Sequence, residues 1–230
     1  MKKILKRALL LLLVLAAALC GTVALQGYQM YRDALEGQSL PERVEEVRSD
    51  PDYTTADQLP AIYLEAVVAV EDHRFWDHWG IDLIAIGRAA WHDLTSWSLK
   101  EGGSTITQQL AKNLYFSQER SFVRKAAEVF MAFDLERSYS KEEILELYVN
   151  SIYFGNGYYC VREASLGYFG KEPWEMDDYE STLLAGIPNA PSVYAMTENP
   201  DLARQRQRFV ERQMERYGGR EEKVNAGQSE

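Results

Sequence analysis

Two glutamates, Glu71 and Glu128, each lie in a dense run of polar residues on a predicted helix, and carboxylates of this kind carry acid–base chemistry. Glu71 follows Val67 by four residues, so its side chain lies on the apolar stripe of its helix. Burial there disfavours the charged carboxylate and raises its pKa toward the range of a useful base near neutral pH. Two carboxylates facing one cleft predict glycosyl chemistry. The alternative is a structural carboxylate at a helix end, paired with Arg74 or His73.

A second polar run, residues 102–113, reads Gly-Gly-Ser-Thr-Ile-Thr-Gln-Gln-Leu-Ala-Lys-Asn and predicts a helix start. Thr105 with Gln108 matches a capping box, and the paired glycines let a ligand approach the backbone closely. Free N–H groups at a helix start attract anions, and Lys112 lies one turn after Gln108 on the same face. The run therefore predicts an anion site, with an ordinary cap and a solvated face as the alternative. Its amide side chains are Gln108, Gln109 and Asn113.

The second glutamate belongs to a predicted helix near residues 121–137. Arg120, Arg124 and Glu128 are spaced four residues apart, which puts them on one face if the helix begins early enough. An i,i+4 ion pair worth about 0.3–0.5 kcal/mol is the commoner explanation of such spacing. The apolar residues around it favour a functional role, because a buried helix excludes charges that are neither paired nor used.

The N-terminal segment predicts a membrane anchor. An uncharged stretch from Ala8 to Leu25 is long enough to cross most of a hydrocarbon core about 30 Å thick. A cleaved signal peptide is the alternative, although this apolar run exceeds the usual signal core of about 7–15 residues. A positive flank stays in the cytoplasm, so the rest of the chain is expected outside the membrane. The basic flank consists of Lys2, Lys3, Lys6 and Arg7.

The remaining chain predicts one mainly α-helical domain. About 205 residues follow the anchor, enough for one domain with a substantial core. Helical periodicity and capping boxes dominate, whereas the alternation typical of strands is scarce. The expected organisation is a cytoplasmic basic tail at 1–7, an anchor at 8–25, a stalk with one short helix at 26–60, a catalytic domain at 61–217 and a disordered tail at 218–230.

Charge and cysteine content exclude several functions. The chain has a formal net charge of −10, and beyond residue 25 it holds 21 basic against 35 acidic side chains. Bulk attraction to nucleic acid is therefore excluded, and any anion site must be a local cluster of bases. The two cysteines, Cys20 and Cys160, lack the spaced partners of a zinc site.

These motifs together resemble the peptidoglycan glycosyltransferases of family fifty-one, which include monofunctional transglycosylases and the glycosyltransferase domain of bifunctional penicillin-binding proteins. The resemblance covers roughly residues 60–215. Its five motifs are matched in order by Glu71, Asp72, Phe75, His78 and Gly80; by Gly102 through Asn113; by Arg124, Lys125 and Glu128; by Lys141, Ile144, Leu145, Tyr148, Asn150 and Gly155; and by Ala185 through Pro191.

The resemblance implies a lysozyme-like helical domain with a smaller hydrophobic jaw, roughly residues 76–101, that dips into the membrane surface. Four of the five tryptophans support a jaw, because this side chain favours the headgroup level of a bilayer. Core aromatics are the alternative explanation. The four are Trp76, Trp79, Trp91 and Trp97.

The activity implied is polymerisation of lipid II into β-1,4-linked glycan, with inversion at the donor sugar and release of undecaprenyl pyrophosphate. Glu71 would be the base, and Glu128 would position the bases that hold the pyrophosphate or stabilise the transition state. No cofactor is obligatory, although a divalent cation, Mg or Mn, could bridge to Glu128. The substrate-binding residues implied are Lys112, Arg120, Arg124, Lys125, Ser104, Gln108, Gln109, Asn113, Asp72, His78 and Asn150.

The implied partners are lipid II, the growing glycan strand and the bacterial membrane, with a separate transpeptidase because no penicillin-reactive domain follows before Glu230. The alternatives to polymerisation are a glycan-cleaving enzyme and a non-catalytic scaffold. A glycan-cleaving lytic transglycosylase or lysozyme would share the helical fold but has no pyrophosphate for a basic cluster to bind. A non-catalytic membrane scaffold for wall synthesis has no need of either glutamate.

Overall fold

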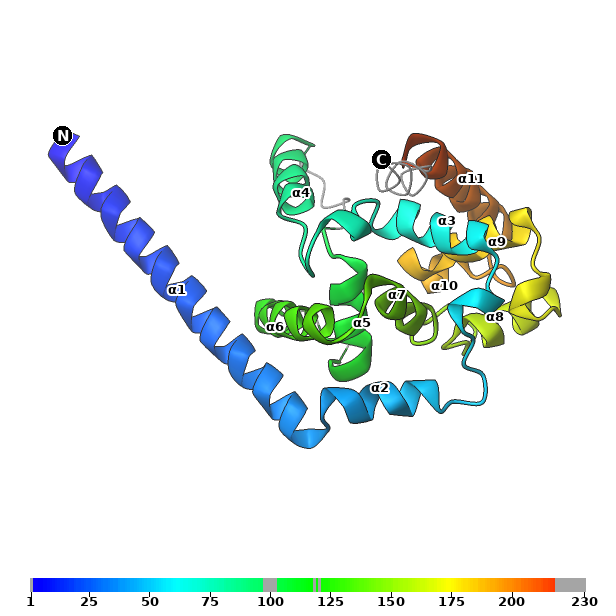
Figure 1. Ribbon diagram of the computed structural model, residues 1–230. Coiled ribbons are helices and arrows are strands. Elements are labelled where there is room, and N and C mark those ends of the chain that lie inside the picture. Colours follow the sequence, from blue (N-terminus) through cyan, green and yellow to red (C-terminus); the bar gives the residue numbers. More distant parts are fainter. Residues whose placement is uncertain (1, 97–102, 118, 120, 218–230) are drawn as a thin grey trace, which may run out of the picture.

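The computed structural model describes residues 2–96, 103–117, 119 and 121–217, and within them the chain is helical with no β-strand (Figure 1). The described residues contain two isolated β-bridges, which pair Trp79 with Ile81 and Gly155 with Tyr158. The mainly α-helical class predicted from the sequence is confirmed. The helices are α1 (Lys2–Gly37), α2 (Leu40–Arg48), α3 (Ala61–Glu71), α4 (Leu83–Ser96), α5 (Ile106–Tyr115), α6 (Phe122–Ser138), α7 (Lys141–Val149), α8 (Val161–Phe169), α9 (Asp178–Gly186), α10 (Pro191–Tyr194) and α11 (Pro200–Tyr217), with short 3-10 turns at Ala56–Gln58, Phe75–Asp77, Pro173–Glu175 and Ile187–Asn189.

Helix α1 leaves the body of the protein as a long rod (Figure 1). Its 36 residues span about 54 Å at 1.5 Å per residue, more than a hydrocarbon core needs. By length and composition it can cross a membrane, and its most apolar stretch is not buried by the rest of the protein. The helix continues past the predicted anchor boundary at Leu25 to Gly37, and its last third packs against α6.

Residues 26–60, which we predicted to form a polar stalk, are largely helical and pack on the domain. Leu40 and Val44 lie one turn apart on α2, and both are buried in the main core together with Leu59. Pro41 falls in the first turn of α2, where a proline removes no helical hydrogen bond. The spacing of Leu40 and Val44 on α2 gives this segment an apolar face, and burial of that face explains why it packs on the domain and does not form a stalk.

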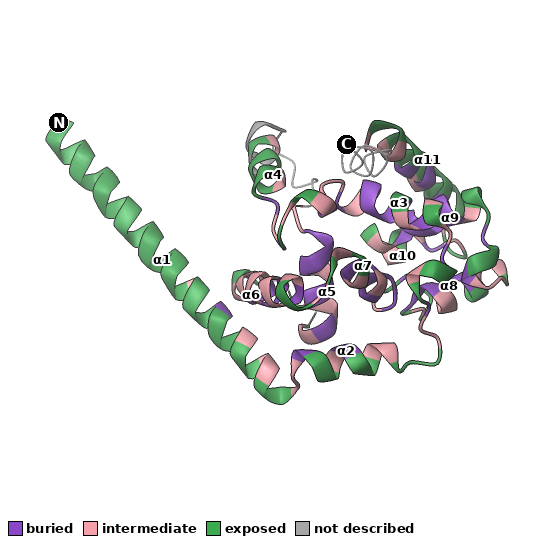
Figure 2. Cartoon of the chain, in the orientation of Figure 1, coloured by how far each residue is buried: buried purple, intermediate pink, exposed green. Residues whose placement is uncertain are grey.

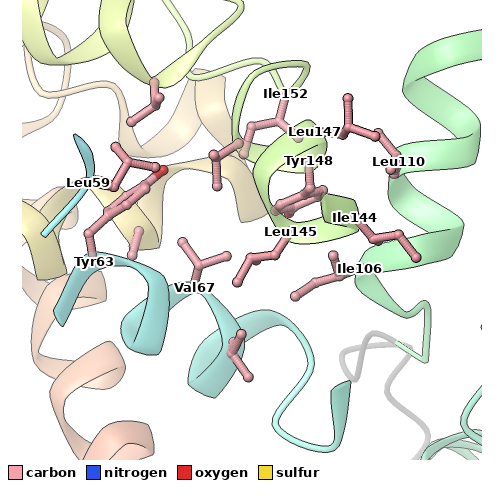
Figure 3. Packing of buried hydrophobic residues seen from close by; sticks show 14 of the residues in the cluster. Leu59, Tyr63, Val67, Ile106, Leu110, Ile144, Leu145, Leu147, Tyr148 and Ile152 are labelled. Carbon is pink, nitrogen blue, oxygen red and sulfur yellow. The ribbon is translucent and has the colours of Figure 1, made fainter. Parts of the chain in front are cut away.

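The main core lies between α3, α5 and α7 (Figure 3). Tyr63 and Val67 of α3 face Tyr148 of α7, and Ile106 and Leu110 of α5 close the other side. All five residues are at most 1% exposed. A second layer forms where α9 and α11 pack against α3. The functional helices therefore start from a rigid interior, which fixes the direction of their polar side chains.

The predicted capping boxes are present, and they set where the helices begin. Thr105, Ser140 and Asp177 each accept a hydrogen bond from the backbone N–H three residues later, and the side chain of that residue bonds back to the cap. Helix α11 begins at Pro200 directly after Asn199, as predicted.

Helix α4 projects from the body, and much of its described length is coloured as exposed (Figures 1 and 2). The predicted jaw continues into residues 97–101 with Trp97, which lie outside the described residues, as does the predicted disordered tail at 218–230. Trp76 is packed against the core, whereas a neighbouring set of apolar residues is between 41% and 71% exposed: Trp79, Leu83, Ile84, Ile86 and Trp91. Most of the described jaw thus presents an apolar surface to its surroundings, unlike a core aromatic cluster.

Candidate active site

Glu71 is the last residue of α3, and its carboxylate is nearly buried, with 8% of the side chain exposed. Gln109 of α5 donates from Nε2 to Glu71 Oε2 at 3.0 Å, and the hydroxyl of Tyr148 donates to Gln109 Oε1 at 3.2 Å. Oε1 of Glu71 is buried and accepts no hydrogen bond from a described residue. Burial raises the pKa of Glu71, while the bond from Gln109 and the positive charge of Arg206 lower it in part.

The alternative pairing of Glu71 with Arg74 is wrong, because Arg74 Nε binds Asp82 Oδ2 at 2.9 Å. His73, the other partner considered, stacks on Tyr217 with ring centroids 3.9 Å apart. The helix-end carboxylate is therefore held by amide and guanidinium groups from α5 and α11.

Arg206 of α11 is a site residue that the sequence reasoning missed. Its Nη2 lies 3.8 Å from Glu71 Oε1, and its Nε donates to the carbonyl of Gly186 at 3.3 Å. The guanidinium also lies over the rings of Tyr194 and Phe209, at 5.8 and 4.8 Å from their centroids. Only 12% of the side chain is exposed, and burial lowers its pKa.

A signal for Arg206 was present in the periodicity of α11. Ala203, Gln207 and Val210 are the buried residues of this helix, and Arg206 lies three residues after the first and four before the last. A base on the buried stripe of a helix needs a partner, which distinguishes it from exposed Arg204 on the same helix.

Asp72 and His78 join the first motif to the start of α5. Asp72 Oδ2 lies 2.9 Å from His78 Nε2 and accepts the backbone N–H of Ile106 at 3.0 Å. Both side chains are 5% exposed. Thr105 strengthens the same junction, since its hydroxyl donates to the carbonyl of Gly80 at 2.7 Å. These contacts position the two motifs against each other, so direct substrate contact by Asp72 and His78 stays a prediction.

Glu128 lies on α6, 1% exposed, and is held by two bases of its own helix. Lys125 donates from Nζ to Oε2 at 2.7 Å, and Arg124 Nε lies 2.9 Å from Oε1 as an ion pair whose N–H is not aligned for a hydrogen bond. Lys125 also donates to the hydroxyl of Ser104 at 2.6 Å. A buried carboxylate with two cations is an arrangement that fixes the positive groups in space.

Lys112 lies on α5, the helix whose Gln109 bonds Glu71. It lies one turn beyond Gln109 on α5, is partly exposed, and makes no ion pair within 4.0 Å of a described residue. Burial lowers the pKa of its ammonium, the carboxylates of Glu128 and Glu71 raise it, and Arg124 and Lys125 lower it further. Because Gln109 of α5 holds Glu71 and α5 packs against α6, the predicted base and the predicted cation cluster both lie next to α5.

The other predicted substrate-binding residues differ in what they contact. Asn150 uses both N–H donors on the carbonyls of Thr54 and Glu146, and its oxygen accepts from the Thr54 N–H, so its amide fixes a loop. Gln108 is 2% exposed and completes the cap with Thr105. Asn113 is on α5 and partly exposed. Arg120 lies outside the described residues.

In the part of the chain that the structure describes, no group of three or more His, Cys, Asp and Glu side chains could hold a metal ion. Glu128, the predicted contact for a divalent cation, already has Arg124 and Lys125 at its two oxygens. These protein groups by themselves do not form a cation site. A groove of about 570 Å³ elsewhere, lined by Ile62 and Tyr179 among others, includes none of the predicted site residues.

This arrangement suits a displacement with an anionic leaving group. A buried carboxylate with a raised pKa can take a proton, and a cluster of fixed cations beside it can neutralise a developing negative charge. Helix α6, which carries these bases, packs against α5, and α5 holds the carboxylate through Gln109.

Comparison with known proteins agrees with this chemistry. A sequence model of a family described as transglycosylase matches residues 37–215. Penicillin-binding protein 1F of Bacillus subtilis (strain 168) is 46% identical over 149 residues, which cover 65% of this chain and 21% of that protein. Penicillin-binding protein 1A of Aquifex aeolicus (strain VF5) is 45% identical over 162 residues, covering 70% and 22%, and that of Neisseria flavescens is 44% identical over 159 residues, covering 69% and 20%.

The chain thus spans about a fifth of the length of the curated relatives that it matches. The matched region includes α2 through most of α11, and with it both glutamates, the cation cluster and Arg206. The family model covers well over half of the chain, and the resemblance drawn from the five motifs is confirmed. The chain belongs to the transglycosylase family and carries a peptidoglycan glycosyltransferase domain.

Proposed function

We propose that this protein polymerises lipid II into β-1,4-linked glycan strands and releases undecaprenyl pyrophosphate. The observation that carries the proposal is the position of α5 between a buried carboxylate and a cation cluster. Gln109 of α5 donates a hydrogen bond to Glu71, and α5 packs against α6, which carries Arg124, Lys125 and Glu128. A glycosyl transfer from a diphosphate needs both a base and a place for the departing charge.

In the proposed reaction, Glu71 accepts the proton of the 4-hydroxyl on the incoming lipid II. The freed oxygen forms a bond to the anomeric carbon of the growing strand from the opposite side, so the configuration inverts. The bond from that carbon to the pyrophosphate breaks, and its electron pair leaves with the lipid diphosphate. Burial supports the role of Glu71, because a raised pKa makes the carboxylate a stronger base.

The leaving group requires positive charge more than it requires a proton. Lys112, Arg124 and Lys125 supply three cations, and Glu128 holds two of them by ion pairs. Ser104 fixes Lys125 from the other side at 2.6 Å. We assign Glu128 to positioning these cations, since both of its oxygens are engaged with them. Arg120, which the sequence also predicts to bind the pyrophosphate, lies outside the described residues.

A divalent cation would have to be held jointly by Glu128 and substrate oxygens, because the described side chains offer no site of three donors. The steps above use only protein groups. We further propose that α1 anchors the protein in the bacterial membrane with its basic end in the cytoplasm and the domain outside, next to lipid-linked substrate. A separate transpeptidase that cross-links the strands remains a predicted partner.

Incubation of the purified protein with lipid II in detergent tests the proposal. Polymeric glycan is expected, and Glu71→Gln should lower its rate by at least about a hundredfold while far-UV circular dichroism stays unchanged. The exposed Glu142→Gln on α7 serves as a matched control and should polymerise at the wild-type rate. Polymer formation at the wild-type rate by Glu71→Gln would remove Glu71 as the base.

Finished peptidoglycan as the substrate distinguishes synthesis from cleavage. The proposed enzyme leaves it intact, whereas a lytic transglycosylase or lysozyme releases soluble fragments. A protein that neither polymerises lipid II nor cleaves finished glycan would instead fit a scaffold.

A further inference from the structure

The anchor helix contacts the catalytic domain through a glycine. Gly27 is the buried residue of α1, a helix that Figure 2 shows as mostly exposed with a few intermediate residues. A Cβ atom at this position would lie 2.5 Å from the Cβ of Ala126 and 3.0 Å from both the N of Ala127 and the carbonyl oxygen of Val123. Cβ atoms essentially never approach other atoms within 3.0 Å, so only glycine fits here without movement.

Aromatic and polar contacts fix the same two helices over the next turns. The ring of Tyr28 meets Phe130 edge-on with centroids 5.4 Å apart, and the ring of Tyr31 lies 5.9 Å from the same phenylalanine. The hydroxyl of Tyr31 donates to Asp134 of α6. These contacts follow helical spacing on both helices, and together they fix how α1 packs against α6.

The residues touched by α1 alternate with the residues of the cation cluster. Arg124, Lys125 and Glu128 flank Ala126 and Ala127 on the same two turns of α6. A shift of α6 therefore moves its cations relative to Glu71, which is held by α3, α5 and α11. Packed helices transmit such shifts because the interior has no free volume to absorb them.

We propose that Gly27 is a positioning residue of the glycosyl transfer, and that the seat of the anchor helix on Val123, Ala126 and Ala127 sets the place of the pyrophosphate-binding cations. This inference rests on the proposed function. It assigns α1 a second role besides holding the protein at the membrane: close helix packing links the anchor to the site.

Alanine at position 27 tests the proposal with the full chain. To reach an ordinary contact of 3.4 Å from 2.5 Å, the two helices must separate by about 0.9 Å. Misplacement by about 1 Å costs an enzyme up to about a hundredfold, so kcat/KM for lipid II in Gly27→Ala should fall by about tenfold to a hundredfold. Added undecaprenyl pyrophosphate should also inhibit the variant more weakly, because that product binds the displaced cations.

The chain supplies a matched control and a rescue. A Cβ at Gly21, on the same helix, meets nothing within 4 Å, so Gly21→Ala should retain the wild-type kcat/KM. Alanine favours helix more than glycine does, so a loss in Gly27→Ala cannot come from a weaker helix. Ala126→Gly in the Gly27→Ala protein removes the 2.5 Å contact but leaves the two backbone contacts at 3.0 Å, so it should recover part of the activity and of the product inhibition.

A Gly27→Ala protein with wild-type kcat/KM, or a loss that Ala126→Gly does not lessen, would overturn the proposal. If the wild-type protein does not polymerise lipid II, the proposed function fails. The close packing of Gly27 on Val123, Ala126 and Ala127 is then tested by thermal unfolding of the same proteins. The contact is supported if Gly27→Ala has a lower Tm and if Ala126→Gly lowers the Tm less in the Gly27→Ala protein than in the wild type, because glycine by itself weakens α6. An unchanged Tm in Gly27→Ala overturns it.

Discussion

At the residue scale, Glu71 combines a reactive position with a cost in stability. Its carboxyl has a raised pKa in the folded protein because it is buried. Below the pKa of Glu71 in the unfolded chain, the carboxyl is neutral in both states, and its burial carries no charge penalty. As pH rises through the folded-state pKa, the buried group ionises and stability is lost.

Glu71→Gln should therefore be more stable than the wild type at neutral pH, although it is inactive. Glutamine keeps the bond to Gln109 and removes the buried charge. We expect the Tm to rise by a few degrees, at about 2–4 °C for each kcal/mol, and the difference to disappear in acid. Calorimetry from pH 4 to pH 8 measures this.

Glu136→Gln provides the contrast for the same measurement. The side chain of Glu136 is 3% exposed and binds Lys141 at 2.7 Å and the hydroxyl of Thr107 at 2.6 Å. Breaking a buried ion pair leaves the remaining charge without a partner, so this variant should lose about 3 kcal/mol. A Glu71→Gln protein that is destabilised as much as Glu136→Gln would contradict the argument.

Arg206 lies outside the five motifs, and its charge affects the pKa of Glu71. Its charge lowers the pKa of Glu71, so Arg206→Gln should raise that pKa further. The acid limb of the pH profile of kcat/KM then moves to higher pH, because the carboxylate must be ionised to accept a proton. Arg204→Gln is the control, since Arg204 is 58% exposed and pairs only with Asp201 among described residues. Identical acid limbs in both variants would place Arg206 outside the catalytic machinery.

At the element scale, the start of α5 holds three parts of the site together. Asp72 accepts the Ile106 N–H, and Thr105 bonds both Gly80 and Gln108. The helix that follows carries Gln109, which donates to Glu71, and Lys112, whose pKa is lowered by burial and raised by the charges of both glutamates. A loosened cap would let these two side chains move together.

Thr105→Ala should accordingly lower both stability and turnover. The loss of a buried cap and of the bond to Gly80 is expected to cost about 2 kcal/mol, with a fall in kcat/KM of at least about tenfold. Ser140→Ala removes an exposed cap from α7 and should cost about 1 kcal/mol without changing kcat/KM. Urea unfolding and the polymerisation assay measure the two effects. Equal kcat/KM in the two variants would argue that α5 is held by its packing alone.

At the scale of the whole molecule, α1 and α4 carry apolar surface outside the main core. Trp91 on α4 is 69% exposed, beside Leu83 at 71% and Ile84 at 60%. Trp174, which precedes α9, is 52% exposed in a different part of the fold. Exposed apolar patches of this kind mark interaction surfaces, and tryptophan favours the interface of a bilayer.

Vesicles with quencher-labelled lipid chains should distinguish these two tryptophans. In the wild-type protein, part of the tryptophan emission should be quenched, and Trp91→Phe should remove a larger quenched fraction than Trp174→Phe. The reason is that α4 is expected to dip into the headgroup layer, while Trp174 faces water. Equal quenched fractions lost in both variants would contradict a membrane-associated α4.

The sequence by itself determined the helical class, the capped starts of α5, α7 and α9, the apolar anchor and the order of the five motifs. These features depend on local spacing, which a single chain displays directly. It also placed Glu71 on a buried stripe, because periodicity reports which face of a helix is covered.

Only the tertiary structure decided which groups meet. Arg206 reaches Glu71 across 135 positions of sequence, and Gly27 meets Ala126 across 99. The periodicity of α11 shows that Arg206 lies on a buried face, but it does not show that Glu71 is the partner, and no local pattern links Gly27 to Ala126. Both contacts depend on how α11 and α1 pack against distant helices. Packing also decides that Asp72 bonds the backbone of Ile106 and that Asn150 bonds the backbone of Thr54. Long-range packing sets such pairs because burial and close fit are properties of the assembled core, whereas the sequence shows only neighbours along the chain.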